Sequence, residues 1–173
     1  MKVARNGKAA ALNADQFEAL LNAAPSPRYR ALWSVQRWTA ARISEALALT
    51  WADVAGGKVT YRRANTKTKS TRQVPQVSQL QAELLRYLHE WADEHGHLPA
   101  PSEALFPAAG STTSTMTRQA ADKALRLACM RVGLTGVSLH SFRRTAAPAP
   151  RGSRGPAPRG AGAHRPQEPW VPG

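Results

Sequence analysis

Two short segments, far apart in the chain, place cationic side chains where they could bind a phosphate. Arg42 precedes the run Ile43-Ser44-Glu45-Ala46-Leu47, and a guanidinium in such apolar surroundings needs an acid or a bound anion as its partner. Glu45, one turn further on, is a suitable acid. His140 and Arg143 are three residues apart, so they share one face if a helix begins there. With a lysine, these side chains could stabilise a pentavalent phosphate, for which catalysis is mainly positioning and charge stabilisation.

The lysine comes from a basic run over residues 58–72 that contains no acid. A hairpin with lysines at its tip has a suitable shape for following a phosphate backbone. An edge strand protected against aggregation by charged residues would look the same. Both interpretations remain open from this run alone. Its six cationic residues are Lys58, Arg62, Arg63, Lys67, Lys69 and Arg72.

The charge of the whole chain favours a polyanionic partner. The 173 residues carry 24 Lys and Arg against 11 Asp and Glu, a net charge of +13. Nucleic acid is the first choice for the partner and an anionic membrane surface the second. No apolar run approaches the roughly 18 residues of a membrane span. The single cysteine, Cys129, excludes an internal disulfide framework and a cysteine-rich zinc site. We expect a reduced, soluble, basic intracellular protein.

Mostly helical segments surround one short hairpin. Asn13 and Gln16 form a capping-box pattern, which predicts the start of a helix. After Gly56-Gly57, alternation of apolar and polar residues over 58–62 predicts a half-buried strand, with a return strand around Val74. Further helices are predicted from apolar residues at helical spacing. Their apolar positions are Phe17, Leu20, Leu21, Tyr29, Leu32, Trp33, Ile43, Ala46, Leu47, Leu80, Leu84, Leu88, Trp91, Ala121, Ala124, Leu125 and Ala128.

The fold class that these elements predict is α+β, mainly α, with a helical core and an inserted β-hairpin. We assign this domain to residues 1–146. Residues 147–173 contain seven Pro, five Gly, five Ala and four Arg, a composition that cannot bury enough surface to fold and predicts a disordered tail. Without the four arginines and one glutamate of this tail, the remainder keeps a net charge of +10. The basic character therefore belongs to the folded domain.

Three motifs, in order along the chain, resemble those of tyrosine recombinases, the phage integrase family. The segment from Arg42 to Asp53 resembles the first arginine motif of that family. The segment from Thr66 to Pro75 resembles its β-hairpin with a catalytic lysine, and Leu139 to Thr145 resembles its His-x-x-Arg motif. Residues 12–23 resemble the helix that opens its catalytic domain. The resemblance covers roughly residues 10–146 and implies that family's catalytic-domain fold.

The resemblance implies a role for each matching residue. Arg42 and Arg143 would hold the non-bridging oxygens of the scissile phosphate. Lys67 would protonate the departing 5′-hydroxyl, and His140 would assist proton transfer. Glu45 would support the site. In the family a tyrosine then attacks the phosphate and forms a 3′-phosphotyrosyl link, so no ATP, cofactor or obligatory metal is needed.

The same resemblance implies double-stranded DNA as the partner and site-specific recombination, including DNA integration, as the activity. A homo-oligomer on DNA is left open, and neither a membrane nor a small-molecule substrate is expected. The expected location is the cytoplasm, in association with the nucleoid. Beside the catalytic residues, the residues expected to contact DNA are Arg62, Arg63, Lys69, Arg72 and Arg144.

The chain departs from the family in one respect that concerns the reaction. Its three tyrosines are Tyr29, Tyr61 and Tyr87, and none follows Arg143, where the family has its nucleophile. No nucleophile is therefore assigned, and catalysis by this chain alone is not expected. The tail has the composition of GC-rich coding DNA read out of frame, so we suggest a frameshift near residue 146. A truncated recombinase, a non-catalytic DNA-binding remnant or regulator, and a basic RNA-associated protein all remain possible.

One segment imitates a metal site. Residues 89–97 read His-Glu-Trp-Ala-Asp-Glu-His-Gly-His, but the helical zinc pattern needs a second histidine four residues after the first. Asp93 occupies that position. We therefore interpret the segment as a frayed, polar helix end and assign no metal.

Overall fold

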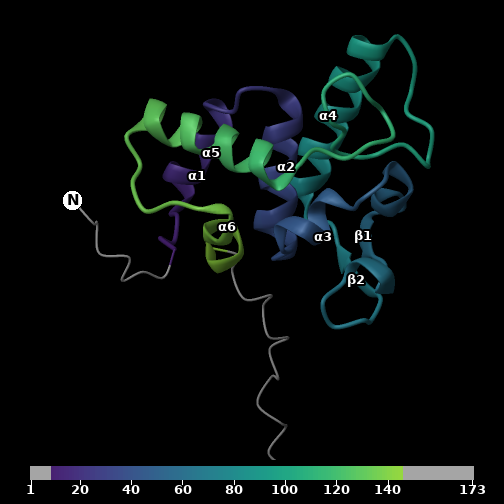
Figure 1. Cartoon of the computed structure of the whole chain (residues 1–173), viewed down its shortest axis with the longest axis horizontal. Helices are drawn as coiled ribbons and strands as arrows, with labels where there is room; N and C mark the ends of the chain where they lie inside the picture. The colour runs from purple at the N-terminus through teal and green to yellow at the C-terminus, as the bar shows by residue number, and fades with distance from the viewer. Residues whose placement is uncertain (1–8, 146–173) are drawn as a thin grey trace, which may run out of the picture.

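The computed structural model of the chain describes residues 9–145 (Figure 1). Helices make up most of this part, and a single two-stranded antiparallel sheet, β1 (Lys58–Tyr61) with β2 (Arg72–Pro75), completes it. This arrangement confirms the predicted α+β, mainly α class. The predicted disordered tail, residues 147–173, lies outside the described residues. The α-helices are α1 (Ala14–Asn22), α2 (Pro27–Thr39), α3 (Ile43–Leu47), α4 (Ser78–His95), α5 (Arg118–Val132) and α6 (Leu139–Thr145), and the short 3₁₀ helices are η1 (Trp51–Val54) and η2 (Arg63–Asn65).

Helix ends follow the local sequence. The Asn13 side chain accepts a hydrogen bond from the Gln16 amide, and the Gln16 side chain accepts one from the Asn13 amide, so the predicted capping box is confirmed. Helix α5 ends at Gly133, whose φ of +69° is left-handed and favours glycine. Helix α4 also ends at a left-handed glycine, Gly96. Residues 89–95 are thus the C-terminal end of α4, as interpreted from the sequence, and Gly96 caps that end.

Helix α2 is the centre of the core, with α4 on one side and α6 on another. Trp33 and Phe142 are fully buried, and their rings stack with centroids 5.9 Å apart. Phe17 of α1 meets the Phe142 ring edge-on at 6.0 Å. This aromatic cluster joins α1, α2 and α6, so it fixes the short last helix against the rest of the fold.

The hairpin has the predicted alternation. Val59 and Tyr61 are buried, whereas Lys58 is exposed and Thr60 half-buried. In the register of the sheet, Tyr61 lies opposite Arg72. Because no third strand of residues 9–145 joins this pair, the hairpin depends on contacts with the helices for its position.

The described residues contain neither a membrane-spanning helix nor a cluster of metal ligands. None of their helices is both long and apolar enough to cross a membrane. Within the same range, no three His, Cys, Asp or Glu side chains are grouped so that they could hold a metal ion. His95 stacks on the Trp91 ring, with centroids 3.9 Å apart, and its Nδ1 bonds the Trp91 carbonyl oxygen at 2.8 Å. These contacts give His95 a structural role at the end of α4.

Candidate functional site

Arg42 lies at the junction of α2 and α3. The chain leaves α2 through Ala40, which adopts a left-handed conformation, and Arg42 then caps α3. Its backbone amide donates to Glu45 Oε2 at 3.1 Å, and its Nη1 lies 3.5 Å from Glu45 Oε1. Glu45 is thus the acid partner that we expected for Arg42. The Arg42 side chain is 34% exposed, however, so the guanidinium is less desolvated than the apolar sequence around it suggested.

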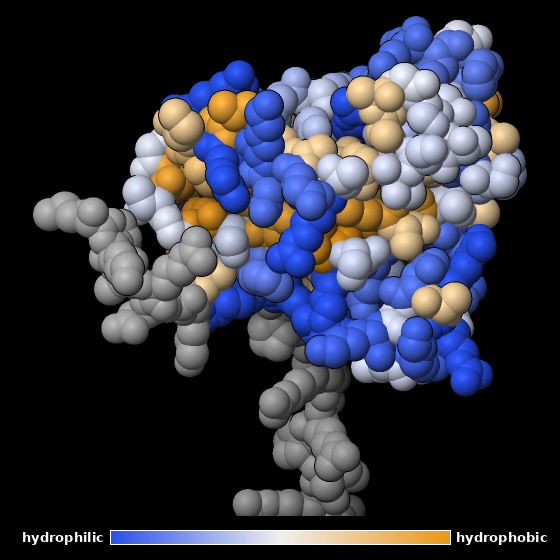
Figure 2. Space-filling view, viewed as in Figure 1, coloured by the Kyte–Doolittle hydropathy of each residue, from blue (hydrophilic) through white to orange (hydrophobic). Residues whose placement is uncertain are grey.

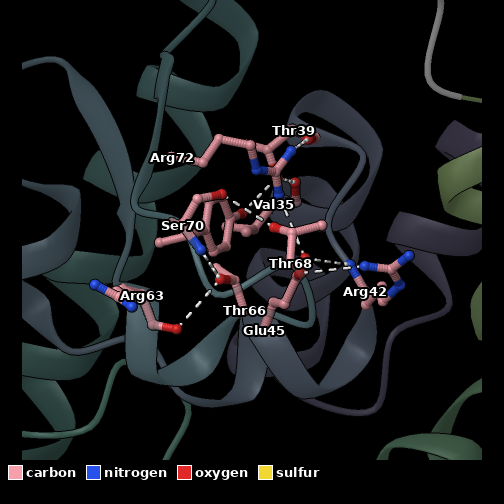
Figure 3. A network of polar contacts seen from close by, with 10 residues as sticks. Val35, Thr39, Arg42, Glu45, Arg63, Thr66, Thr68, Ser70 and Arg72 are labelled. Atoms are coloured by element: carbon pink, nitrogen blue, oxygen red, sulfur yellow. Dashed lines mark hydrogen bonds and ion pairs between the residues drawn. The ribbon is translucent and has the colours of Figure 1, made fainter.

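A second arginine reaches the same carboxylate from the hairpin (Figure 3). Arg72 Nη2 lies 3.3 Å from Glu45 Oε2, and Arg72 Nη1 donates to the Thr39 carbonyl oxygen at 3.2 Å. Its guanidinium also lies over the Tyr61 ring, 4.5 Å from the centroid. One buried carboxylate therefore faces two arginines, and the group carries a net charge of +1. Both side chains remain partly open to solvent, at 34% and 40% exposure, so an anion can approach.

Two hydroxyl groups beneath this cluster, those of Tyr61 and Thr39, have hydrogen-bond partners within the protein. The Tyr61 and Thr39 side-chain oxygens are hydrogen-bonded, and Thr39 Oγ1 also donates to the Val35 carbonyl oxygen at 2.7 Å. Burial raises the pKa of Tyr61 well above the ordinary range of tyrosine. Burial does the same to the pKa of Tyr87, whose hydroxyl donates to the Leu105 carbonyl oxygen at 2.7 Å. Sequence reasoning missed the Tyr61–Thr39 pair because nothing local marks it.

These two tyrosines predict loss of stability at alkaline pH. Above about pH 10 the unfolded chain releases tyrosine protons that the folded chain retains, so the free energy of unfolding falls as the pH rises. The expected slope is about 1.4 kcal/mol per pH unit for each buried tyrosine. Urea unfolding between about pH 10 and about pH 12 measures it. Tyr61→Phe should remove about half of the combined slope of the two tyrosines. An unchanged slope would contradict the raised pKa of Tyr61.

The tip of the hairpin is organised by Thr66. This residue is 4% exposed, and its Oγ1 donates to the Ser70 carbonyl oxygen at 2.9 Å and lies 3.3 Å from the Arg63 carbonyl oxygen. The Ser70 amide donates back to Thr66 Oγ1 at 3.2 Å. Lys67 follows directly and is exposed, and Lys69 adopts a left-handed conformation with a φ of 55°. The turn therefore presents Lys67 from a hydrogen-bonded loop.

Helix α6 presents the other two motif residues outward. Leu139, Ser141 and Phe142 are buried, whereas His140 and Arg143 are exposed. The helix on which His140 and Arg143 would share one face is thus present, and both lie on its open side.

The C-terminal end of α2 joins α6 to the arginine cluster. Arg37 donates to the Thr145 carbonyl oxygen of α6, and two residues later the Thr39 carbonyl oxygen accepts from Arg72 of the hairpin. Figure 1 shows α6, the α2–α3 junction and the hairpin along the lower edge of the molecule. Figure 2 shows hydrophilic side chains gathered along the same edge. The elements that carry the predicted catalytic residues therefore meet at one end of α2.

The structure does not join all of the predicted site residues. In the part of the chain that it describes, Arg42 and Glu45 form an ion pair, but no hydrogen bond or ion pair connects Lys67, His140 or Arg143 to them. Their catalytic roles stay predictions.

The residues predicted to contact DNA differ in their surroundings. Arg62 Nε donates to Asp53 Oδ1 at 2.8 Å, and Asp53 is buried. Arg144 Nη1 donates to the Ala9 carbonyl oxygen at 2.6 Å. Arg63 and Lys69 are exposed beside the hairpin turn. Asp53 was not singled out from the sequence, although its position three residues after Thr50, which donates to it through both N and Oγ1, fits a capping pattern.

Solved recombinases share this fold. XerA recombinase is 20% identical over 80% of this chain and 49% of XerA, with a TM-score of 0.62. A lambda integrase tetramer bound to a Holliday junction is 15% identical over 84% of this chain and 44% of the integrase, with a TM-score of 0.60. XerH bound to its difH substrate before cleavage is 22% identical over 78% of this chain and 40% of XerH, with a TM-score of 0.60. The chain thus spans about half or less of the length of these proteins.

Sequence comparison agrees with the structural one. No curated protein sequence matches the chain significantly. The profile of the phage integrase family, in contrast, matches residues 10–149, close to the range expected from the three motifs. This match includes the arginine cluster, the hairpin and α6. The chain therefore belongs to the phage integrase family.

Proposed function

We propose that this chain is a DNA-binding catalytic domain of a site-specific recombinase and that it holds one DNA phosphate between Arg42 and Arg143. The observation that carries the proposal is the open, net positive cluster at the end of α2, where Glu45 faces two arginines. Duplex DNA offers such a cluster a regular array of phosphates. Among proteins of this fold, XerH and lambda integrase have been seen bound to DNA, and DNA as partner would place this chain with the nucleoid.

In the proposed reaction, charge stabilisation comes from Arg42 and Arg143 and proton transfer from Lys67 and His140. A tyrosine hydroxyl attacks the phosphorus, so that a tyrosyl O–P bond forms as the bond to the 5′-oxygen breaks. Lys67 gives its proton to the departing 5′-oxygen, and His140 assists removal of the tyrosine proton. No free energy source is needed because the phosphotyrosyl link keeps the energy of the broken bond.

The tyrosine is the part of this scheme that the chain does not supply. Tyr61 and Tyr87 are buried with bonded hydroxyls. Tyr29 lies in the first turn of α2, about 15 Å along the helix from its C-terminal end. We therefore propose that a homologous recombinase chain that keeps this tyrosine provides the nucleophile in trans. The alternative that these positions favour is a non-catalytic DNA-binding remnant or regulator.

Substitution of single arginines tests the phosphate site. Arg42→Ala and Arg143→Ala should each weaken binding to duplex DNA about tenfold or more, because a charge-assisted bond contributes about 1.5–3 kcal/mol. Arg62→Ala should cost less, since Asp53 faces that guanidinium alone, whereas Arg42 shares Glu45 with Arg72. Fluorescence anisotropy with a mixed-sequence duplex, repeated at several salt concentrations, gives both affinity and the number of phosphates contacted.

The matched control is Arg86→Ala. Arg86 is an exposed arginine of α4 paired with Glu90, and it lines a hollow with the residues that join α1 to α2, at the opposite end of α2 from Arg42. Loss of the Arg86 side chain should leave the affinity for DNA nearly unchanged. Equal losses in Arg42→Ala and Arg62→Ala would show that the phosphate site is not assembled. Tighter binding to RNA than to duplex DNA would instead favour the RNA-associated alternative.

A further inference from the structure

We infer that Arg72 is a positioning residue, which anchors the Lys67 hairpin to the α2–α3 junction and keeps Arg42 free to bind phosphate. Sequence reasoning had assigned Arg72 to DNA contact. The effect on DNA rests on the proposed function, whereas the anchoring concerns the protein alone.

The anchoring follows from the contacts of a single guanidinium (Figure 3). Arg72 is the first residue of β2 and so lies where the turn that holds Lys67 ends. Its two terminal nitrogens donate to different elements, Nη1 to the last residue of α2, Thr39, and Nη2 to Glu45 of α3. The guanidinium also covers the ring of its cross-strand neighbour, Tyr61, a cation–π contact. Arg72 therefore ties the return strand to both helices.

This anchor matters because the turn end of the hairpin is otherwise held mainly from β1. Val59 and Tyr61 of β1 are buried, and Arg62, the residue after β1, pairs with Asp53 of η1. In β2, Val74 is half-buried and the remaining residues other than Arg72 face solvent or the partner strand. Without Arg72, the end of the turn nearest β2 would lose its ion pair with the helices. We therefore expect Lys67 to occupy a wider range of positions.

The second consequence concerns the charge of Arg42. The Glu45 carboxylate divides its oxygens, with Oε1 toward Arg42 and Oε2 toward Arg72 and the Arg42 amide. If Arg72 were removed, the carboxylate would serve Arg42 alone, and the pair would be neutral. An arginine held by its own carboxylate binds a phosphate less well, because the phosphate must compete with that partner. Arg72 thus draws part of the Glu45 charge away from Arg42.

Hydrogen exchange without DNA tests the anchoring. Arg72→Met keeps the aliphatic stem and removes the charge and donors, whereas Arg72→Lys restores the charge. In Arg72→Met we expect faster exchange at the Ser70 amide, which is bonded to Thr66 Oγ1, while α2 and α4 keep their protection. Arg72→Lys should recover part of the protection. The control, Arg62→Met, removes the other hairpin ion pair and should leave Ser70 unchanged. Unchanged exchange in Arg72→Met would overturn the anchoring.

A double-mutant cycle on DNA affinity tests the effect on Arg42. Arg72→Met should weaken binding about as much as Arg42→Ala, and the double variant should be no weaker than Arg42→Ala alone, because both act through one site. If the double variant lost affinity by the product of the two single-variant losses, Arg72 would contact DNA independently, and the inference would be overturned. If Arg42→Ala itself has no effect, the proposed function fails, and hydrogen exchange still decides whether Arg72 anchors the hairpin.

Discussion

Replacing Phe142 with alanine is expected to lower the free energy of unfolding by about 3–5 kcal/mol, the range for deleting a buried aromatic ring. Phe142 is fully buried and contacts the rings of Trp33 and Phe17. It is also the main anchor of α6, a helix of seven residues that is too short to persist without packing. We therefore expect DNA binding to fall as well, since His140 and Arg143 would lose their support. Denaturant unfolding gives the first quantity and anisotropy the second.

Two comparisons separate the anchoring of α6 from a general effect of losing apolar surface. Phe142→Leu keeps most of the buried volume and should cost clearly less than Phe142→Ala. Met130→Ala removes a side chain that is 78% exposed on α5 and should change stability by no more than about 0.5 kcal/mol. If Phe142→Ala resembled Met130→Ala, the aromatic cluster would not hold α6.

Features fixed by neighbouring residues were predictable from the sequence. The capping box of Asn13 and Gln16 needs one helical turn, and the alternation that buries Val59 and Tyr61 needs one strand. The pairing of Arg42 with Glu45 also lies within one turn. In each case the sequence separation is short, so the local backbone geometry determines the contact.

The contacts that shape the candidate site lie at longer separations. Glu45 and Arg72 are 27 residues apart, and Thr39 and Tyr61 are 22 residues apart. A run of six cationic residues does not reveal which of them will meet a buried acid, because that depends on how the hairpin docks on the helices. The same docking leaves Arg42 one-third exposed, which its apolar neighbours in the sequence did not suggest. Distinguishing a DNA contact from a positioning arginine therefore required the tertiary structure.

The largest functional effect is expected in the formation of a covalent link to DNA. A nicked duplex that traps phosphotyrosyl intermediates should give no detergent-resistant adduct with this 173-residue chain alone, because Tyr61 and Tyr87 are buried with bonded hydroxyls and Tyr29 lies at the far end of α2. Gel mobility of labelled DNA after denaturation measures the adduct. An adduct that disappears in Tyr29→Phe would contradict this expectation, since Tyr29 is the tyrosine that is only half-buried.

The same assay distinguishes an incomplete site from a defective one. If this chain is mixed with a catalytically impaired homologue that keeps its tyrosine but lacks its own first arginine, an adduct requires one chain to supply the arginines and the other the nucleophile. We expect an adduct in that mixture and its loss when this chain carries Arg42→Ala, while Arg86→Ala leaves it intact. No adduct in the mixture, together with normal DNA binding, would mean that the cluster binds phosphate without activating it, and a non-catalytic DNA-binding role would follow.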